Sequence, residues 1–186
     1  ARALEELRHV PAGDLRRREG EAASKTCGKH VEHLFRSALA RENKDDANVA
    51  MWLAGRLPNH DDDEVTLQQR LQQDWNKFQM DRAIDEARAR LRNATDSQDN
   101  LETLMDSLDL AEFHAHLAHR HGEPRINQVL AELQPRISAH LERLLRARRL
   151  DDIEGALNVI GAARLEALRL HSIQSTLEGL RGLDLL

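Results

Sequence analysis

Aromatic residues and cysteine are scarce in this sequence. It contains no tyrosine, three phenylalanines, two tryptophans and a single cysteine, Cys27. Strands favour aromatic and β-branched residues in alternating runs, and because Val, Ile and Thr form no such runs here, we expect no sheet. One cysteine cannot form a disulfide within the chain, which fits a reducing compartment.

Long apolar runs and an excess of positive charge are also missing. The most apolar stretch, residues 49–54, is far shorter than the roughly 18 residues that span a membrane. The formal net charge is −5, whereas a domain that binds nucleic acid through its phosphates normally carries a positive excess. We therefore expect a soluble domain that neither crosses a membrane nor binds nucleic acid.

The abundant residues are strong helix formers. Leu, Ala, Arg, Glu and Asp fill most positions, and charged residues make up 32% of the chain. Its 186 residues suit one domain, and because it starts at Ala1 without Met, we expect a piece excised from a longer protein. The prediction is an all-α, irregular bundle of about seven to nine helices forming one domain, residues 1–186, with a polar linker near residues 93–100.

Apolar spacing and capping residues predict the helices. A repeat between residues 39–57 and 145–165 needs a two-residue insertion, and shared capping chemistry explains it, so we predict no solenoid. In the third and sixth helices the predicted buried faces contain Val49 with Trp52, and Leu110 with Phe113, respectively. The expected helices cover residues 2–10, 15–42, 45–57, 64–93, 101–108, 110–118 and 126–133, then an element that Pro135 starts or kinks, and a long final helix from Asp151 or Asp152 to about residue 177.

Histidines cluster at the end of the sixth predicted helix. At about 100° per residue, His114 and His121 fall on one helical face and His116 and His119 on nearly the opposite one, so these four do not converge on a metal. No zinc-ligand spacing and no phosphate-binding loop is present, and we predict neither a metal nor a cofactor. Because Gly122 and Pro124 end this helix and display its last turn, we predict a partner-binding patch with Leu117 as its apolar anchor. The patch consists of His116, Leu117, His119, Arg120 and His121.

Cys27 is the only candidate for a thiol nucleophile. Lys25, Lys29 and His30 stand close to it in the sequence, and such groups stabilise a thiolate. Its helical position nevertheless places Cys27 on the same stripe as Val31, so burial as a small apolar residue is the stronger expectation.

Residues 21–35 resemble the cysteine segment of the secreted bacterial ubiquitin ligases that follow leucine-rich repeats. In that family an Asp stands two residues after the Cys, whereas this sequence has Lys29 there. The length and the helical, Arg/Ala/Leu/His-rich composition also resemble the C-terminal E3 ubiquitin-ligase domain of plant-pathogen type III effectors. The resemblance covers about fifteen of the 186 residues by motif and the remainder by composition alone.

The resemblance implies a domain that binds an E2 conjugating enzyme charged with ubiquitin and promotes ubiquitin transfer in the host cell cytoplasm. Transfer would proceed through a thioester on Cys27 or, because Lys29 replaces the Asp, without a covalent intermediate by positioning the reactants. No cofactor is implied. The alternative is a helical adaptor or scaffold module that binds other proteins without catalysis.

Overall fold

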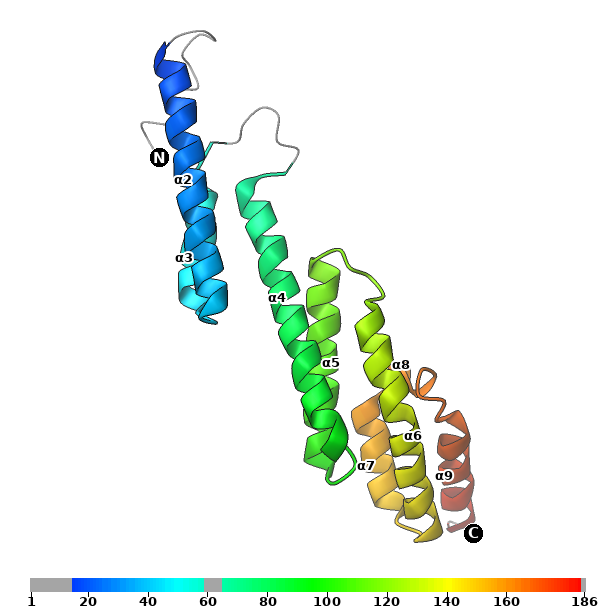
Figure 1. Cartoon of the computed structure of the whole chain (residues 1–186). Helices are drawn as coiled ribbons and strands as arrows, with labels where there is room; N and C mark the ends of the chain where they lie inside the picture. Colours follow the sequence, from blue (N-terminus) through cyan, green and yellow to red (C-terminus); the bar gives the residue numbers. More distant parts are fainter. Residues whose placement is uncertain (1–14, 59–64, 185–186) are drawn as a thin grey trace. The chain divides into compact units, whose positions relative to one another are not determined.

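The computed structural model describes residues 15–58 and 65–184. These residues form eight α-helices and one 3-10 helix and contain no strand, so the predicted all-α fold is confirmed (Figure 1). None of the described helices combines the length and the hydropathy needed to cross a membrane. The helix predicted over residues 2–10 and the predicted helix start at residue 64 lie outside the described residues.

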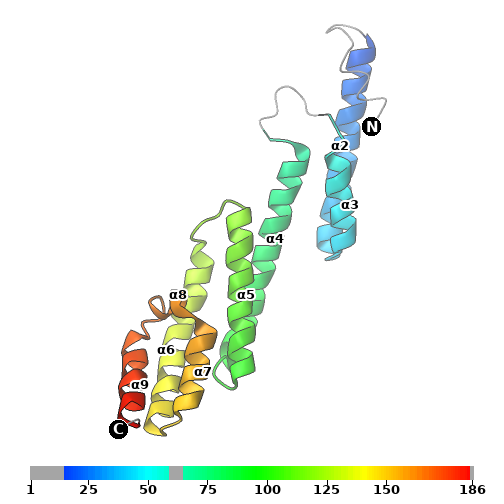
Figure 2. The same cartoon turned by 180° about the vertical axis from the view of Figure 1, so that it is seen from behind.

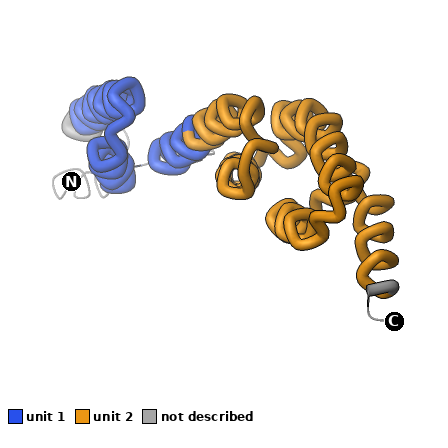
Figure 3. Tube along the Cα trace, turned by 90° about the horizontal axis from the view of Figure 1, so that it is seen from below, with its two compact units in different colours: residues 1–78 blue, residues 79–186 orange. Residues whose placement is uncertain are grey.

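The chain divides into two compact units, Ala1–Phe78 and Gln79–Leu186 (Figure 3). The polar stretch at residues 93–100 lies within the second unit. Unit 1 contains α2 (Leu15–Ala40), α3 (Lys44–Ala54) and the first half of α4 (Leu67–Arg90). Unit 2 contains the second half of α4, η2 (Leu91–Asn93), α5 (Gln98–Leu117), α6 (Pro124–Arg146), α7 (Leu150–Ile160), α8 (Ala162–Leu165) and α9 (His171–Asp184).

In unit 1, α2 and α3 lie side by side as an antiparallel hairpin (Figures 1 and 2). The side chain of Asn43 caps α3 by accepting hydrogen bonds from the backbone N–H groups of Asp45 and Asp46, both at 3.1 Å. The core of the unit also takes in the start of α4. Its buried residues are Val31, Phe35, Ala38, Ala47, Ala50, Met51, Ala54, Leu71 and Trp75.

The predicted burial of Val49 and Trp52 on α3 is wrong, whereas Leu53 and Leu57, expected on the same face, are partly buried. Val49 and Trp52 are each 55% exposed, and the guanidinium of Arg56 lies 3.8 Å from the centre of the Trp52 ring. The face that packs on α2 consists of Met51 and three alanines. Because α3 carries apolar residues on two faces, periodicity alone does not decide which face is buried.

Hairpin α2–α3 is repeated by hairpin α6–α7. The second helix spans 11 residues in both, and a glycine follows it in both, Gly55 or Gly161. The two-residue insertion inferred from the sequence is confined to Ala162 and Ala163, which lie in α8 after the repeated part. Buried Val31, Phe35, Ala38, Ala47, Ala50, Met51 and Ala54 correspond in order to buried Ile137, Leu141, Leu144, Ile153, Ala156, Leu157 and Ile160.

Among residues 15–58 and 65–184, four helical segments end at a non-glycine residue in the left-handed region. Glu42, His119, Arg148 and Arg169 have φ angles of 53°, 55°, 54° and 55°. After α6, for example, the N–H of Arg148 donates to the carbonyl of Leu145 and that of Arg149 to the carbonyl of Leu144, both at 3.0 Å. This is the hydrogen-bond pattern of a helix end at which glycine is usual. Each of these residues lies in the turn that follows a helical segment.

Three of the predicted helix boundaries in unit 2 are wrong. Residues 98–117 form one helix, α5, because the buried face continues from Leu108 to Ala111 without a breaker. Pro135 does not start a helix but lies inside α6, where its missing N–H removes only one backbone hydrogen bond. The predicted final helix is three helices, α7, α8 and α9, because Gly161 has a φ of 74°, a conformation that ends α7.

The apolar residues of α4 belong to two cores. Leu71 and Trp75 belong to the core of unit 1, whereas Met80 and Ile84 belong to that of unit 2. The core of unit 2 draws on α4 to α9 and includes Leu104, Leu108, Val129, Leu133, Ile137, Leu141, Ile153, Leu168 and Leu170, all fully buried.

Candidate functional site

The outer face of α5 exposes an apolar stripe. Leu110, Phe113 and Leu117 are 47%, 56% and 40% exposed. At about 100° per residue these three side chains fall within about 60° of one another, opposite the face of α5 that is buried in the core. The predicted burial of Leu110 and Phe113 is therefore wrong. In one continuous helix the face that carries Leu104, Leu108, Ala111 and Ala115 occupies the core instead. We call Leu110, Phe113 and Leu117 the α5 stripe.

Carboxylates dominate the first half of the same helix. Between Gln98 and Leu117, α5 has no lysine or arginine. Exposed Asp106 lies one helical turn before Leu110 and on the line of the α5 stripe, and exposed Glu102 lies one turn earlier. Neither carboxylate forms an ion pair with another described residue. Two solvent-exposed carboxylates, those of Glu102 and Asp106, therefore precede the apolar stripe on α5.

The other two carboxylates of this region are neutralised by a buried arginine. Arg164 of α8 is 8% exposed, and its Nη2 lies 2.6 Å from Asp109 Oδ1 and 3.2 Å from Glu112 Oε1. Its Nη1 lies 3.9 Å from the sulfur of Met105. Because the guanidinium is buried and both carboxylates are exposed, Arg164 ties α8 to α5 from inside the core.

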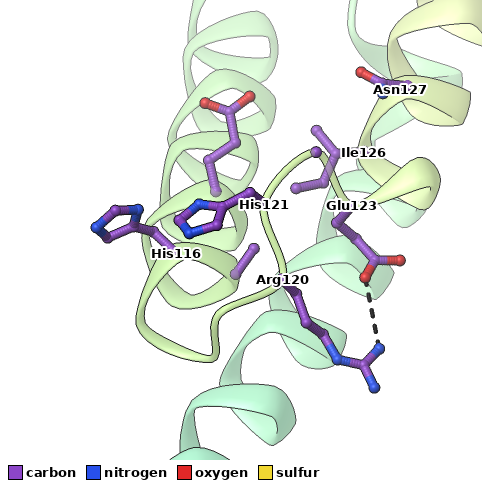
Figure 4. A pocket seen from close by; sticks show the side chains of 9 residues that line it. His116, Arg120, His121, Glu123, Ile126 and Asn127 are labelled. Carbon is purple, nitrogen blue, oxygen red and sulfur yellow. Dashed lines mark ion pairs between the residues drawn. The ribbon is translucent and has the colours of Figure 1, made fainter.

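A hollow of about 270 Å³ lies where the chain passes from α5 to α6 (Figure 4). The rings of His116 and His121 stand edge to face with their centres 4.8 Å apart. Three residues of the predicted partner-binding patch, His116, Arg120 and His121, are thus brought together. Leu117 faces outward on the α5 stripe, and His119 forms the turn after α5; neither lines the hollow. Its lining residues are Glu112, Ala115, His116, Arg120, His121, Gly122, Glu123, Ile126 and Asn127.

Charge in this hollow is arranged around the buried carboxylate of Glu123. Arg125 Nε donates a hydrogen bond to Glu123 Oε1 at 2.6 Å, and Arg125 Nη2 lies 2.7 Å from Asp81 Oδ1. The hydrogen bond from Arg125 lowers the pKa of Glu123, and the two carboxylates raise the pKa of Arg125. Arg120 lies farther away, with Nη1 3.7 Å from Glu123 Oε2, and its side chain is 47% exposed. Because the hydrogen bond to Glu123 comes from Arg125, the more exposed Arg120 can also reach a second anionic group.

Cys27 is exposed on α2, so its predicted burial is wrong. The matching position of α6 is Leu133, which is fully buried. Helix α7 is as short as α3, so helix length does not explain the difference; α6 also packs against α5 and α9, which belong to the same core as Leu133. The ring Nδ1 of His30 lies 2.8 Å from the carbonyl oxygen of Thr26, within hydrogen-bonding distance.

Within residues 15–58 and 65–184, no three His, Cys, Asp or Glu side chains are arranged to hold a metal ion. The histidines of the predicted patch instead surround the hollow and the turn after α5. Comparisons with protein-family profiles, curated proteins and solved structures found no match to this chain.

Proposed function

We propose that this chain is a protein-binding helical module and that the α5 stripe of unit 2 is its main contact surface. The observation that carries the proposal is the exposure of Leu110, Phe113 and Leu117 on one line of a well-packed helix. Together they leave on the order of 300 Å² open, the size of the largest apolar patches on typical monomers, which are often functional. Buried Leu104, Leu108 and Ala111 hold the same helix in place, so the surface is preformed.

Capture experiments with a matched pair of variants test this function. Leu110→Ser with Phe113→Ser removes most of the α5 stripe, whereas Val49→Ser with Trp52→Ser removes equally exposed apolar surface from unit 1. All four side chains are about half exposed, so both variants should keep their far-UV circular dichroism. We expect bound protein to be lost only with the α5 variant. Equal capture by both variants and the unchanged chain would contradict the proposal.

A second candidate function is ubiquitin transfer, as the resemblance implies, and the exposure of Cys27 favours it. A thioester requires that the thiol reach a ubiquitin-charged conjugating enzyme, and an exposed thiol on α2 meets that requirement. The test is an in vitro reaction with activating enzyme, a panel of conjugating enzymes, ubiquitin and this chain. Ubiquitin chains that form with the unchanged protein but not with Cys27→Ala indicate a thioester intermediate. Ubiquitin chains that form with both proteins indicate transfer by positioning. Absence of activity across the panel would exclude this function.

A further inference from the structure

We infer that the partner segment that binds the α5 stripe is an amphipathic helix, acidic near its N-terminus and basic near its C-terminus, and that it lies antiparallel to α5. This inference rests on the function proposed above and adds the chemistry and direction of the partner. Three features of unit 2 carry it: the spacing of the apolar side chains, the exposed carboxylates before them and the basic corner after them.

The spacing of the stripe fits a helix. Leu110, Phe113 and Leu117 follow one another at three and four residues, and the first and last are about 10 Å apart along the axis. A partner helix presents apolar side chains at the same intervals and packs them between those of α5. A partner strand would need an unpaired sheet edge, and the described residues contain no strand.

The charges on either side of the stripe give the direction. Glu102 and Asp106 precede it, are exposed and have no ion-pair partner among the described residues. Exposed His119, Arg120 and His121 follow it, and exposed His116 lies next to its last residue. A partner whose basic end lies beside Glu102 and Asp106 and whose acidic end lies beside Arg120 matches both ends. Acidic residues stabilise the N-terminus of a helix and basic residues its C-terminus, so such a partner runs antiparallel to α5.

The acidic end of the partner helix binds at the hollow beside the α5–α6 connection. Arg120 is half exposed and only 3.7 Å from a carboxylate that Arg125 already binds at 2.6 Å. It can therefore turn to a carboxylate of the partner without leaving Glu123 uncompensated. Figure 4 shows Arg120 directed toward Glu123, and the rings of His116 and His121 beside each other on the other side of the loop.

Synthetic helical peptides test the inference. The ordered peptide carries Leu at the stripe spacing with Glu in its first two turns and Lys in its last two; the neutral peptide has Gln in place of every charge. Binding to the full chain is measured by fluorescence anisotropy at low salt. We expect the ordered peptide to bind about tenfold more tightly than the neutral one, and we expect the advantage to shrink in high salt, which screens exposed charges.

Variants of the chain separate the charge effect from differences in peptide helicity. Glu102→Lys with Asp106→Lys should abolish the advantage of the ordered peptide while leaving the neutral peptide unchanged. The charge-matched control, Asp85→Lys with Glu166→Lys, alters exposed carboxylates elsewhere in unit 2 and should preserve the advantage. Phe113→Ser should weaken both peptides by about tenfold or more, as loss of a central aromatic anchor does.

The outcomes distinguish the inference from the proposed function. If both peptides bind equally and both depend on Phe113, the apolar surface binds a partner but the inferred charge order is wrong. If neither binds below about 1 mM, where the free energy of binding is only about 4 kcal/mol, the inference and the proposed function both fail. If the chain self-associates in sedimentation velocity and Phe113→Ser abolishes this, the partner helix is α5 of a second copy, which has the inferred charge order; if Glu102→Lys with Asp106→Lys leaves this self-association unchanged, the inferred charge order is wrong.

Discussion

The left-handed turn after α6 makes a stabilising substitution predictable. Arg148 has a φ of 54°, is exposed, and forms no side-chain ion pair or hydrogen bond with another described residue. Its backbone N–H donates to the carbonyl of Leu145 at 3.0 Å, a bond that any residue can make. Arg148→Gly therefore removes the steric cost of the left-handed conformation and no observed contact.

The magnitude follows from two opposing contributions. An L-residue in the left-handed region costs roughly 1–2 kcal/mol. Glycine regains this but loses more conformational freedom on folding, which costs roughly 0.5–1 kcal/mol. The net expectation for Arg148→Gly is an increase of about 0.5–1 kcal/mol in the free energy of unfolding. Arg136→Gly, the same change in the interior of α6, should instead lower it by about 1 kcal/mol.

Urea unfolding followed by circular dichroism at 222 nm measures both changes. Tryptophan fluorescence is not suitable here, because Trp52 and Trp75 both belong to unit 1 and α6 belongs to unit 2. Opposite shifts of the midpoint at unchanged slope are the expected result. If Arg148→Gly lowers the free energy of unfolding as Arg136→Gly does, the backbone at position 148 is not left-handed and the reasoning is refuted.

Three further predictions concern a cap, a buried cation and a histidine. Asn43→Ala should lower the stability of unit 1 by about 1 kcal/mol, because α3 loses its N-terminal cap; tryptophan fluorescence measures this, and an unchanged midpoint would contradict it. Arg164→Met should change the stability of unit 2 by less than about 1 kcal/mol, whereas Asp109→Asn with Glu112→Gln should lower it by about 1.5–3 kcal/mol, because the buried guanidinium loses both counter-charges; equal midpoints in urea would argue against this. Burial lowers the pKa of His140, so the unfolded chain binds a proton more readily and stability should fall as the pH drops below about 6.5; His140→Gln should lose less stability between about pH 7.5 and 5.5, and identical losses would exclude the effect.

The sequence predicted elements well where local signals agree. The helices expected over residues 15–42 and 45–57 correspond to α2 and α3, although α3 ends at Ala54, before Pro58. The residues of α4 divide between the cores of the two units. It predicted boundaries poorly where the structure uses non-glycine residues or a tolerated breaker. His119, Arg148 and Arg169 give no sequence signal of a left-handed turn, and Pro135 was overweighted because the buried residues on either side of it hold α6 together.

The candidate site was recovered only in part. His116, Arg120 and His121 were predicted as a patch and do meet at one hollow. Leu117 was expected to be exposed as an anchor, but its neighbours on the stripe, Leu110 and Phe113, were assigned to the core. A sequence signal for the exposed stripe did exist. If residues 98–117 are treated as one helix, its apolar residues fall on two opposite faces, and only one of them can be buried in the core.

The sequence by itself determined that this protein is all-α, because helix formers fill it and no alternating β-branched run opposes them. It also determined most helical segments, since capping and periodicity are local properties of the chain. Only the tertiary structure decided which apolar face of α3 and α5 is buried and that Cys27 is exposed. Periodicity defines the faces of a helix, but burial depends on which neighbouring helices are present and how far they extend.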